Sequence, residues 1–530
     1  MRTRGCQVLR ALAIAAIVTL AAAAGPAGAQ TGKDTLAIGL YIPLASVDPH
    51  VVVTRPDFDV LKNVFEPLVD LVRDTVEIGP VLATKWAVSD DGRTWTFTLR
   101  RGVVFHDGTP FNAAAVKQNF DRIVALKKGY SWTLPPIEGI EAVDEGTVRF
   151  VLKRPEPILP KLLSLFPLVS PTAIKANQQG SDWATAWSVA NGVGTGPYKF
   201  DSVKVRGDIV TSKHEKYWGG WNRPHATRVI FRAVPEAATQ RILLERGDLD
   251  IAQSVNPSHV AELERNPTLK VVKGVTATQM YLRFHSQAGA TKDKRVRQAL
   301  NYAWDAEAFE KFMGGLIRPS DGPAPREIMG AGYKAPAIPY RYDLDRAKAL
   351  LAEAGFPNGG FAIEYYYNTG DEEKRLMGVV LQSQAAKLGV KVNLHVTAWP
   401  TLVSKAVAWK EKRQDPPEIT AYAQYISPRY PDGAAFFKFM YHSSAQSGNG
   451  RNFMFYGNPE VDRLVDEAIA ATSEAHANGY YEKAARLIID DAPDIFVGKM
   501  MDVAAMRKDV QGYYIMPANF RAIRAYELHK

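Results

Sequence analysis

A helix followed by a strand, helix, strand series is the feature that most limits how this chain can fold. Residues 343–355 repeat apolar side chains at helical spacing, with an aspartate placed to cap the first turn and a glycine placed to end the last. An apolar run at 363–367, a helical stretch and strict alternation at 390–396 follow. This order predicts a right-handed parallel crossover, and therefore an α/β lobe. Further on, Asn458 and Pro459 suit the cap and first position of another helix.

The first half of the chain is richer in strand signals. Trp95, Phe97 and Leu99 alternate with polar residues, and the turn sequences Asp-Asp-Gly and His-Asp-Gly lie on either side of them. These strand signals predict an α+β lobe in this half. A chain of 530 residues is long enough for two or more lobes, so a second lobe of different character is expected. Further strands are predicted at 148–152, 209–212 and 229–234.

The N-terminus has the order of a secretory signal peptide. Three arginines precede an uncharged apolar run at 11–24, which is followed by Ala27, Gly28 and Ala29. The run is shorter than the roughly 20 residues of a membrane-spanning helix, so an uncleaved anchor is the less favoured alternative. We expect residues 1–29 to be removed, export to the periplasm, and a mature chain that begins at Gln30.

The single cysteine, Cys6, lies before the apolar run. The predicted mature chain therefore lacks thiols, which excludes disulfides, thiolate metal sites and a cysteine nucleophile. The net charge of +9 is spread along the chain without a block of like charges, so we expect no nucleic-acid partner.

The sequence lacks the usual signatures of enzymes. It contains no G-x-S-x-G, H-E-x-x-H or Walker A motif, and its ten histidines are scattered. His442 alone could not satisfy a transition metal. The glycines at 192–196 superficially resemble a phosphate loop, but Pro197 and a strand pattern follow them, which favours a turn or ligand-facing backbone. We expect no catalytic residue, no metal site and no cofactor.

A series of consecutive motifs resembles the family 5 extracellular solute-binding proteins, the group that contains the dipeptide-, oligopeptide- and nickel-binding proteins of ABC importers. The most specific is LATKWAVSDDGRTWTFTLRRGVVFHDGTPF at 82–111. The others follow in the family's order from about residue 35 to 515: LAIGLYIPLASVDP, FEPL, GTGPYKF, GDLD, VRQALNYAWD, YDLDRAKALLAEAGFPNG, YGNPEVDRLVDEA and DDAPDIF.

The resemblance implies the type II fold of periplasmic binding proteins, α/β overall with an α+β N-terminal lobe, an extra N-terminal subdomain and a hinge between lobes. Two chain crossings are expected at the hinge, near residues 281–285 and 497–507. The expected division is a signal peptide at 1–29, lobe I at 30–284 with the extra subdomain at roughly 76–195, lobe II at 285–500, and a return to lobe I at 501–530.

Candidate ligand contacts lie in the second half of the chain. Trp399 follows a predicted strand, and strand ends in α/β sheets face the ligand crevice. A core aromatic is the alternative for this residue. The segment 421–436 corresponds to a family loop that bears a tryptophan and, in the dipeptide binders, an aspartate for the peptide's ammonium. Tyr425, Arg429 and Asp432 offer a ring, a fork of donors and the only acid there. A solvated loop whose charges pair with each other is the alternative.

Three further candidates belong to the first half. Tyr41 and Asp48 lie near the end of the first mature strand, although Asp48 could instead cap a turn. Gly194 offers backbone that can approach a ligand closely.

The function implied is capture of a small ligand, a short peptide or peptide-like solute, between two lobes that close on it. The resemblance also implies a monomer that works with inner-membrane permease subunits and cytoplasmic ATPases of an ABC importer. Opines, oligosaccharides and metal chelates stay open as ligands. A secreted hydrolase, a chemoreceptor partner and a periplasmic chaperone are the alternative functions.

Overall fold

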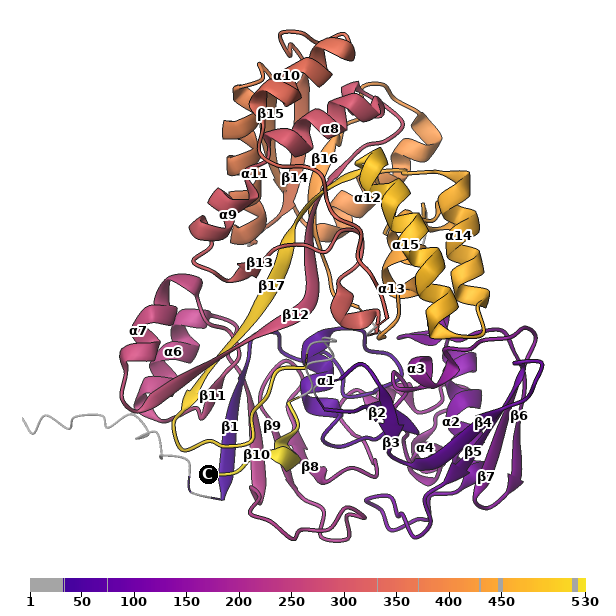
Figure 1. Cartoon of the computed structure of the whole chain (residues 1–530). Helices are drawn as coiled ribbons and strands as arrows, with labels where there is room; N and C mark the ends of the chain where they lie inside the picture. The colour runs from indigo at the N-terminus through magenta and orange to yellow at the C-terminus, as the bar shows by residue number, and fades with distance from the viewer. Residues whose placement is uncertain are drawn as a thin grey trace, which may run out of the picture.

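The computed structural model describes residues 32, 34–73, 75–330, 332–369, 371–428, 430–446, 451–516 and 523–530. The predicted signal peptide, the expected start at Gln30 and the candidate Arg429 lie outside these residues. Figure 1 shows two lobes joined by two long strands, β12 (Leu269–Phe284) and β17 (Asp494–Arg507). The lower lobe holds β1 to β11 and α1 to α7, and the upper lobe holds α8 to α15.

One mixed sheet of eleven strands runs through both lobes. Its strand order is β15-β14-β16-β12-β17-β11-β1-β10-β9-β8, and β13 also pairs with β17. β12 and β17 pair antiparallel over most of their length, with register shifts between Val275 and Gln279 and between Met280 and Tyr281. β12 and β17 each run from one lobe into the other, so no strand end marks the boundary between the lobes. The residue limits predicted for lobe I and lobe II therefore stay predictions.

The upper lobe confirms the predicted crossover. β14 (Ala362–Asn368) and β15 (Lys391–Thr397) are parallel neighbours, connected by α11 (Glu372–Ala386). The predicted caps are also confirmed: Asp343 accepts a hydrogen bond from the backbone N–H of the first turn of α10 (Leu344–Glu353), and Asn458 caps α14 (Pro459–Ala470). The remaining elements of this lobe are α8 (Lys294–Ala303), α9 (Ala306–Phe312), β13 (Ile317–Arg318), α12 (Trp399–Lys412), β16 (Ala421–Ile426), α13 (Ala434–Phe436) and α15 (Glu474–Asp491).

The lower lobe has the expected α+β character. Trp95, Phe97 and Leu99 all lie buried on one face of β5 (Thr94–Leu99), in the antiparallel sheet β4-β5-β7-β6. The other elements are β1 (Thr35–Leu40), α1 (Arg55–Leu61), β2 (Val69–Leu71), β3 (Ile78–Pro80), β4 (Ala83–Val88), α2 (Ala113–Leu126), β6 (Ile137–Asp144), β7 (Thr147–Leu152), α3 (Leu159–Leu163), α4 (Pro171–Asn177), α5 (Thr185–Ser188), β8 (Tyr198–Val203), β9 (Ile209–Lys213), β10 (Arg228–Ala233), α6 (Ala237–Arg246), β11 (Ile251–Ala252) and α7 (Val260–Arg265).

A buried ion pair joins the two hinge strands inside the upper lobe, near the end of β12 and at the start of β17. Arg283 of β12 and Asp494 of β17 are 2.8 Å apart, and both side chains are fully buried. The hydroxyl of Tyr441 donates a second hydrogen bond to Asp494 at 2.7 Å. A buried charge pair needs such additional partners to offset its loss of hydration.

Candidate functional site

The carboxyl ends of three strands of the upper lobe point toward the lower lobe. β12 starts in the apolar cluster of the lower lobe that contains Leu269 and ends in the upper core beside Phe284. β16 runs antiparallel to β12, and β14 and β15 run parallel to β16 and to each other. Loops after the carboxyl ends of parallel strands are the usual place for ligand contacts in α/β sheets.

An aromatic cluster lies at this edge and reaches into the lower lobe. Trp399 begins α12 directly after β15 and is half-buried. The Arg451 guanidinium is 5.3 Å from the ring centre of Trp399 and 5.6 Å from that of Phe439. Phe439 stacks on Trp132 of the lower lobe, with ring centres 5.7 Å apart and planes 14° from parallel. With Phe453, whose ring centre is 6.1 Å from that of Trp399, these residues form the inter-lobe aromatic cluster.

The hinge holds the segment that carries this cluster. Two guanidinium nitrogens of Arg283 donate hydrogen bonds to the backbone oxygens of Arg451 (2.8 Å) and Met440 (3.1 Å). The same guanidinium is paired with Asp494. Because β12 and β17 contribute both partners of that pair, the hinge strands position Phe439 and Arg451 from inside the upper lobe.

Tyr425 takes part in a polar network at the same edge. Its hydroxyl donates to Asp371 at 3.0 Å, and Lys374 lies 2.8 Å from Asp371 and 4.6 Å from the Tyr425 ring centre. Burial and the negative charges of Asp371 and Glu373 raise the pKa of Tyr425 well above its usual value. The phenol therefore stays protonated and acts as a donor.

Asp432 forms an ion pair between the lobes. Its carboxylate is 3.2 Å from the ammonium of Lys161 in the lower lobe, and it accepts hydrogen bonds from the hydroxyl of Tyr481 (3.4 Å) and the backbone N–H of Ala434 (3.0 Å). The sequence singled out Asp432 as a partner for a ligand ammonium, whereas here a lysine of the protein supplies one. No sequence signal pointed to Lys161.

Asp48 pairs inside the lower lobe. It lies 2.6 Å from Arg122, and both side chains are 1% exposed. Burial alone would raise the pKa of Asp48, but the hydrogen bonds and charge of Arg122 lower it below its usual value. Asp48 also accepts a hydrogen bond from the backbone N–H of His50 at 3.0 Å. This bond is the one expected if Asp48 caps a turn, which was the alternative interpretation of this residue.

The other two candidates also lie in the lower lobe. Tyr41 follows β1 and is half-buried. Gly194 packs so closely on the chain that a Cβ atom would lie 2.0 Å from the backbone oxygen of Val64, and its N–H faces Nδ1 of His106 at 3.3 Å. Its lack of a side chain is therefore required by packing within the lobe.

Among the described residues, no cluster of three or more histidine, cysteine, aspartate or glutamate side chains could hold a metal ion. None of the helices in the described part of the chain has the length and apolar composition needed to cross a membrane.

Comparison with known proteins decides the family. The model of the bacterial extracellular solute-binding proteins, family 5, middle region, matches residues 77–448. The chain belongs to this family. It is 28% identical over 500 residues to the probable D,D-dipeptide-binding periplasmic protein DdpA of Escherichia coli, with 93% of each chain covered. It is 31% identical over 512 residues to the glutathione-binding protein GsiB of Pectobacterium atrosepticum, with 95% of each covered.

Several solved structures share the fold. The periplasmic binding protein DppA of Helicobacter pylori, in complex with the peptide STSA, is 25% identical with a TM-score of 0.78, covering 93% of this chain and 98% of that one. CtaP of Listeria monocytogenes gives a TM-score of 0.82 at 22% identity, covering 94% and 99%. The expected type II α/β fold is confirmed. The family 5 solute-binding protein is thus of the class that serves ABC importers, and its relatives are binding proteins rather than enzymes.

Proposed function

We propose that this family 5 solute-binding protein captures a short peptide or peptide-like solute between its lobes and hands it to the permease of an ABC importer. The observation that carries the proposal is the direct contact of the lobes at the carboxyl-end edge, through Trp132 with Phe439 and Lys161 with Asp432. A ligand held there stabilises the closed arrangement by its higher affinity for closed than for open lobes.

The chemistry of the edge supports a peptide-like ligand. The rings of Trp399 and Phe453 offer apolar faces, and the Arg451 guanidinium beside them supplies the positive charge that a ligand carboxylate requires. The relatives named for D,D-dipeptide and glutathione bind ligands of this class. Tyr41, Tyr425 and Arg429 are further proposed contacts, together with Asp432 through its pair with Lys161.

The rest of the proposal is supported by the N-terminal sequence and by the resemblance to binding proteins of importers. We propose export by a signal peptide cleaved after Ala29, a periplasmic monomer, and partner permease subunits with cytoplasmic ATPases. Binding requires no cofactor, no metal site of the protein and no nucleic acid, and makes or breaks no bond.

Mass spectrometry of ligand released from natively purified protein tests the ligand class. A peptide or amino-acid conjugate is expected, whereas an opine, an oligosaccharide or a metal chelate would replace the peptide assignment within the same binding function. Incubation of the protein with a library of peptides and oligosaccharides should leave the library unchanged. Cleavage products in the library would instead identify a secreted hydrolase.

Calorimetry with the released ligand tests the site. Trp399→Ala should weaken binding by about 1 kcal/mol through lost ring contact. Trp187→Ala is a matched control in the lower lobe, where Trp187 packs against the core. Equal affinity of parent and Trp399→Ala would remove Trp399 from the site.

A further inference from the structure

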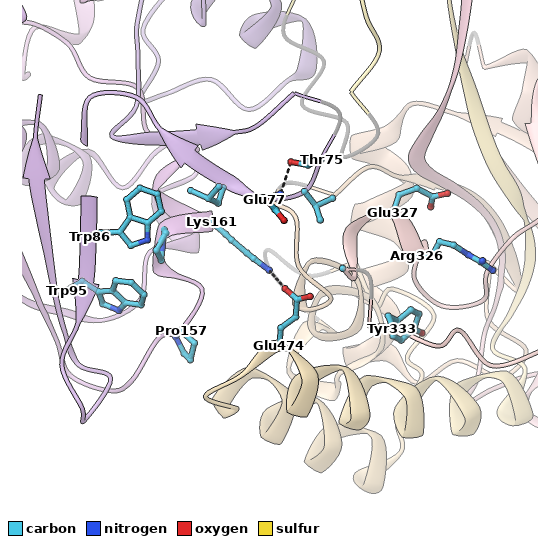
Figure 2. Close-up of a pocket in the computed structure, with 14 residues that line it drawn as sticks. Thr75, Glu77, Trp86, Trp95, Pro157, Lys161, Arg326, Glu327, Tyr333 and Glu474 are labelled. Atoms are coloured by element: carbon cyan, nitrogen blue, oxygen red, sulfur yellow. Dashed lines mark hydrogen bonds and ion pairs between the residues drawn. The ribbon is translucent and has the colours of Figure 1, made fainter. Parts of the chain in front are cut away.

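Three carboxyl groups and one lysine lie together where the two lobes contact each other. The lower lobe supplies Lys161, on α3, and Glu156, on the loop before that helix. The upper lobe supplies Asp432 and Glu474, the first residue of α15. Figure 2 shows Lys161 reaching toward Glu474 in the cavity of about 900 Å³ that both residues line, with their charged atoms 4.0 Å apart. Asp432 is closer to the same ammonium, at 3.2 Å.

A single lysine cannot neutralise three carboxylates. The side chain of Glu474 is 58% exposed, so water stabilises its charge. The side chains of Lys161 and Asp432 are 22% and 13% exposed, and they neutralise each other. Glu156 is only 5% exposed, and its side chain takes part in no hydrogen bond or ion pair with any other residue that the structure describes. A buried carboxyl group without a counter-charge is more stable protonated than ionised.

The charges that act on Glu156 come from both lobes. Arg154, exposed on the same loop, favours the ionised form, and Asp432 of the upper lobe opposes it. Tyr481 of α15 interacts with both acids, and burial keeps its hydroxyl protonated by raising its pKa well above the usual value. Burial and the charge of Asp432 together raise the pKa of Glu156 to about 7. When the lobes separate, Asp432 leaves with the upper lobe while Arg154 stays, so ionisation of Glu156 becomes easier.

We propose that closure of the lobes is coupled to the uptake of one proton by Glu156 from solvent. Asp432 approaches Glu156 at lower cost once that proton has removed the like charge. Because the closed arrangement holds a proton that the open one has lost, the ratio of closed to open protein is high in acid and falls as the pH rises through about 7. Ligand affinity follows the same direction, since ligand binds the closed arrangement. The inference rests on the proposed closure, but not on the identity of the ligand.

Distances between two spin labels on the mature protein without ligand test this coupling. The predicted mature chain has no cysteine, so two introduced cysteines carry the only labels. Val88→Cys on β4 and Ala475→Cys on α15 are exposed positions, close in sequence to the cavity residues Trp86 and Glu474 of opposite lobes. Electron–electron resonance then gives the closed and open fractions. We expect the closed-to-open ratio to fall about tenfold between about pH 5.5 and 8.5, the effect of one unit of difference in pKa between the two arrangements.

Two substitutions show which carboxyl group is responsible. Glu156→Gln imitates the protonated side chain, so its ratio of closed to open protein should stay constant over this pH range. Glu66→Gln is the matched control, because burial also raises the pKa of Glu66 to about 7. The hydrogen bonds of Glu66 all lie within the lower lobe, to Thr195, Tyr217 and Trp218. This variant should therefore show the pH dependence of the parent.

Two results would overturn the proposal. One is a distance distribution in the parent that does not change with pH. The other is a pH dependence that Glu156→Gln retains or that Glu66→Gln removes. Because the labelled protein is measured without ligand, neither result bears on ligand capture, which the released ligand and its calorimetry test separately.

Discussion

At the scale of single residues, the partner of a carboxylate decides what it can do. Asp48 and Asp432 were both candidate ligand contacts, and both are paired with a cation distant in the sequence. The Asp48 pair is enclosed within the lower lobe, whereas the Asp432 pair joins the lobes. Only the second pair changes when the lobes separate, so only Asp432 is expected to influence binding through closure.

Removing either side of the Lys161–Asp432 pair should weaken ligand binding. Lys161→Met and Asp432→Asn should each lower affinity by about 1 kcal/mol or more, because each leaves a partly buried charge unpaired in the closed arrangement. Calorimetry on both variants and the double variant measures their coupling, and the double variant should lose less than the sum. Additive losses would mean that Asp432 contacts the ligand directly instead of acting through Lys161.

Glu156 should make stability depend on pH near neutrality. Burial raises the pKa of Glu156 to about 7 from the ordinary 4.5, and the negative charge of Asp432 adds to this against the opposing charge of Arg154. The folded state therefore keeps a proton that the unfolded chain has lost. This contribution to stability is fully present below about pH 4.5 and is lost as the pH rises through about 7.

Urea unfolding of the parent and Glu156→Gln at several pH values measures this contribution. The neutral variant should gain stability relative to the parent as the pH rises from about 5 to 7.5. Glu66, whose pKa burial also raises to about 7, is present in both proteins and cancels in the difference. A difference that stays constant across this range would refute ionisation of Glu156 near pH 7.

At the scale of elements, the hinge strands both connect the lobes and anchor the upper-lobe site. β12 and β17 are paired across the boundary, and the Arg283–Asp494 pair joins their ends inside the upper lobe. The carbonyl groups of Met440 and Arg451 bind to the same guanidinium. Loss of this ion pair should therefore lower the stability of the protein and change the arrangement of the aromatic cluster.

Asp494→Asn should lower the free energy of unfolding by about 3–5 kcal/mol, the cost of leaving a buried charge without its partner. Chemical denaturation followed by circular dichroism gives the value. Glu460→Gln removes one side of an exposed pair on α14 and should change stability by less than about 1 kcal/mol. Similar values for the two variants would show that Arg283 finds another counter-charge.

At the scale of the whole molecule, two lobes connected by paired strands should close on ligand without changing their secondary structure. X-ray scattering should show a smaller radius of gyration at saturating ligand, while circular dichroism stays constant. The melting temperature should rise with ligand concentration, because ligand binds the folded chain and not the unfolded one. An unchanged radius of gyration, in protein shown to be open beforehand, would contradict hinge closure.

The sequence by itself determined the elements whose signals are local. Asp343 and Asn458 cap their helices as predicted, because a cap bonds to N–H groups two or three residues away. The β14–α11–β15 crossover and the buried face of β5 follow from periodicity within each segment. The ordered motifs were enough to identify the family. Trp399 could also be placed at the end of a strand, since that position depends on the preceding run alone.

Only the tertiary structure decided which side chains meet between the lobes. Lys161 and Asp432 are 271 residues apart, and Trp132 and Phe439 also come from different lobes. No periodicity relates such positions. The sequence therefore indicated Asp432 and Trp399 as candidates, but it did not indicate their partners Lys161, Arg451 and Trp132. A carboxylate in a loop looks the same in sequence whether it faces a ligand, a buried arginine or the opposite lobe. Its surroundings, which depend on the path of the whole chain, determine which of these it binds.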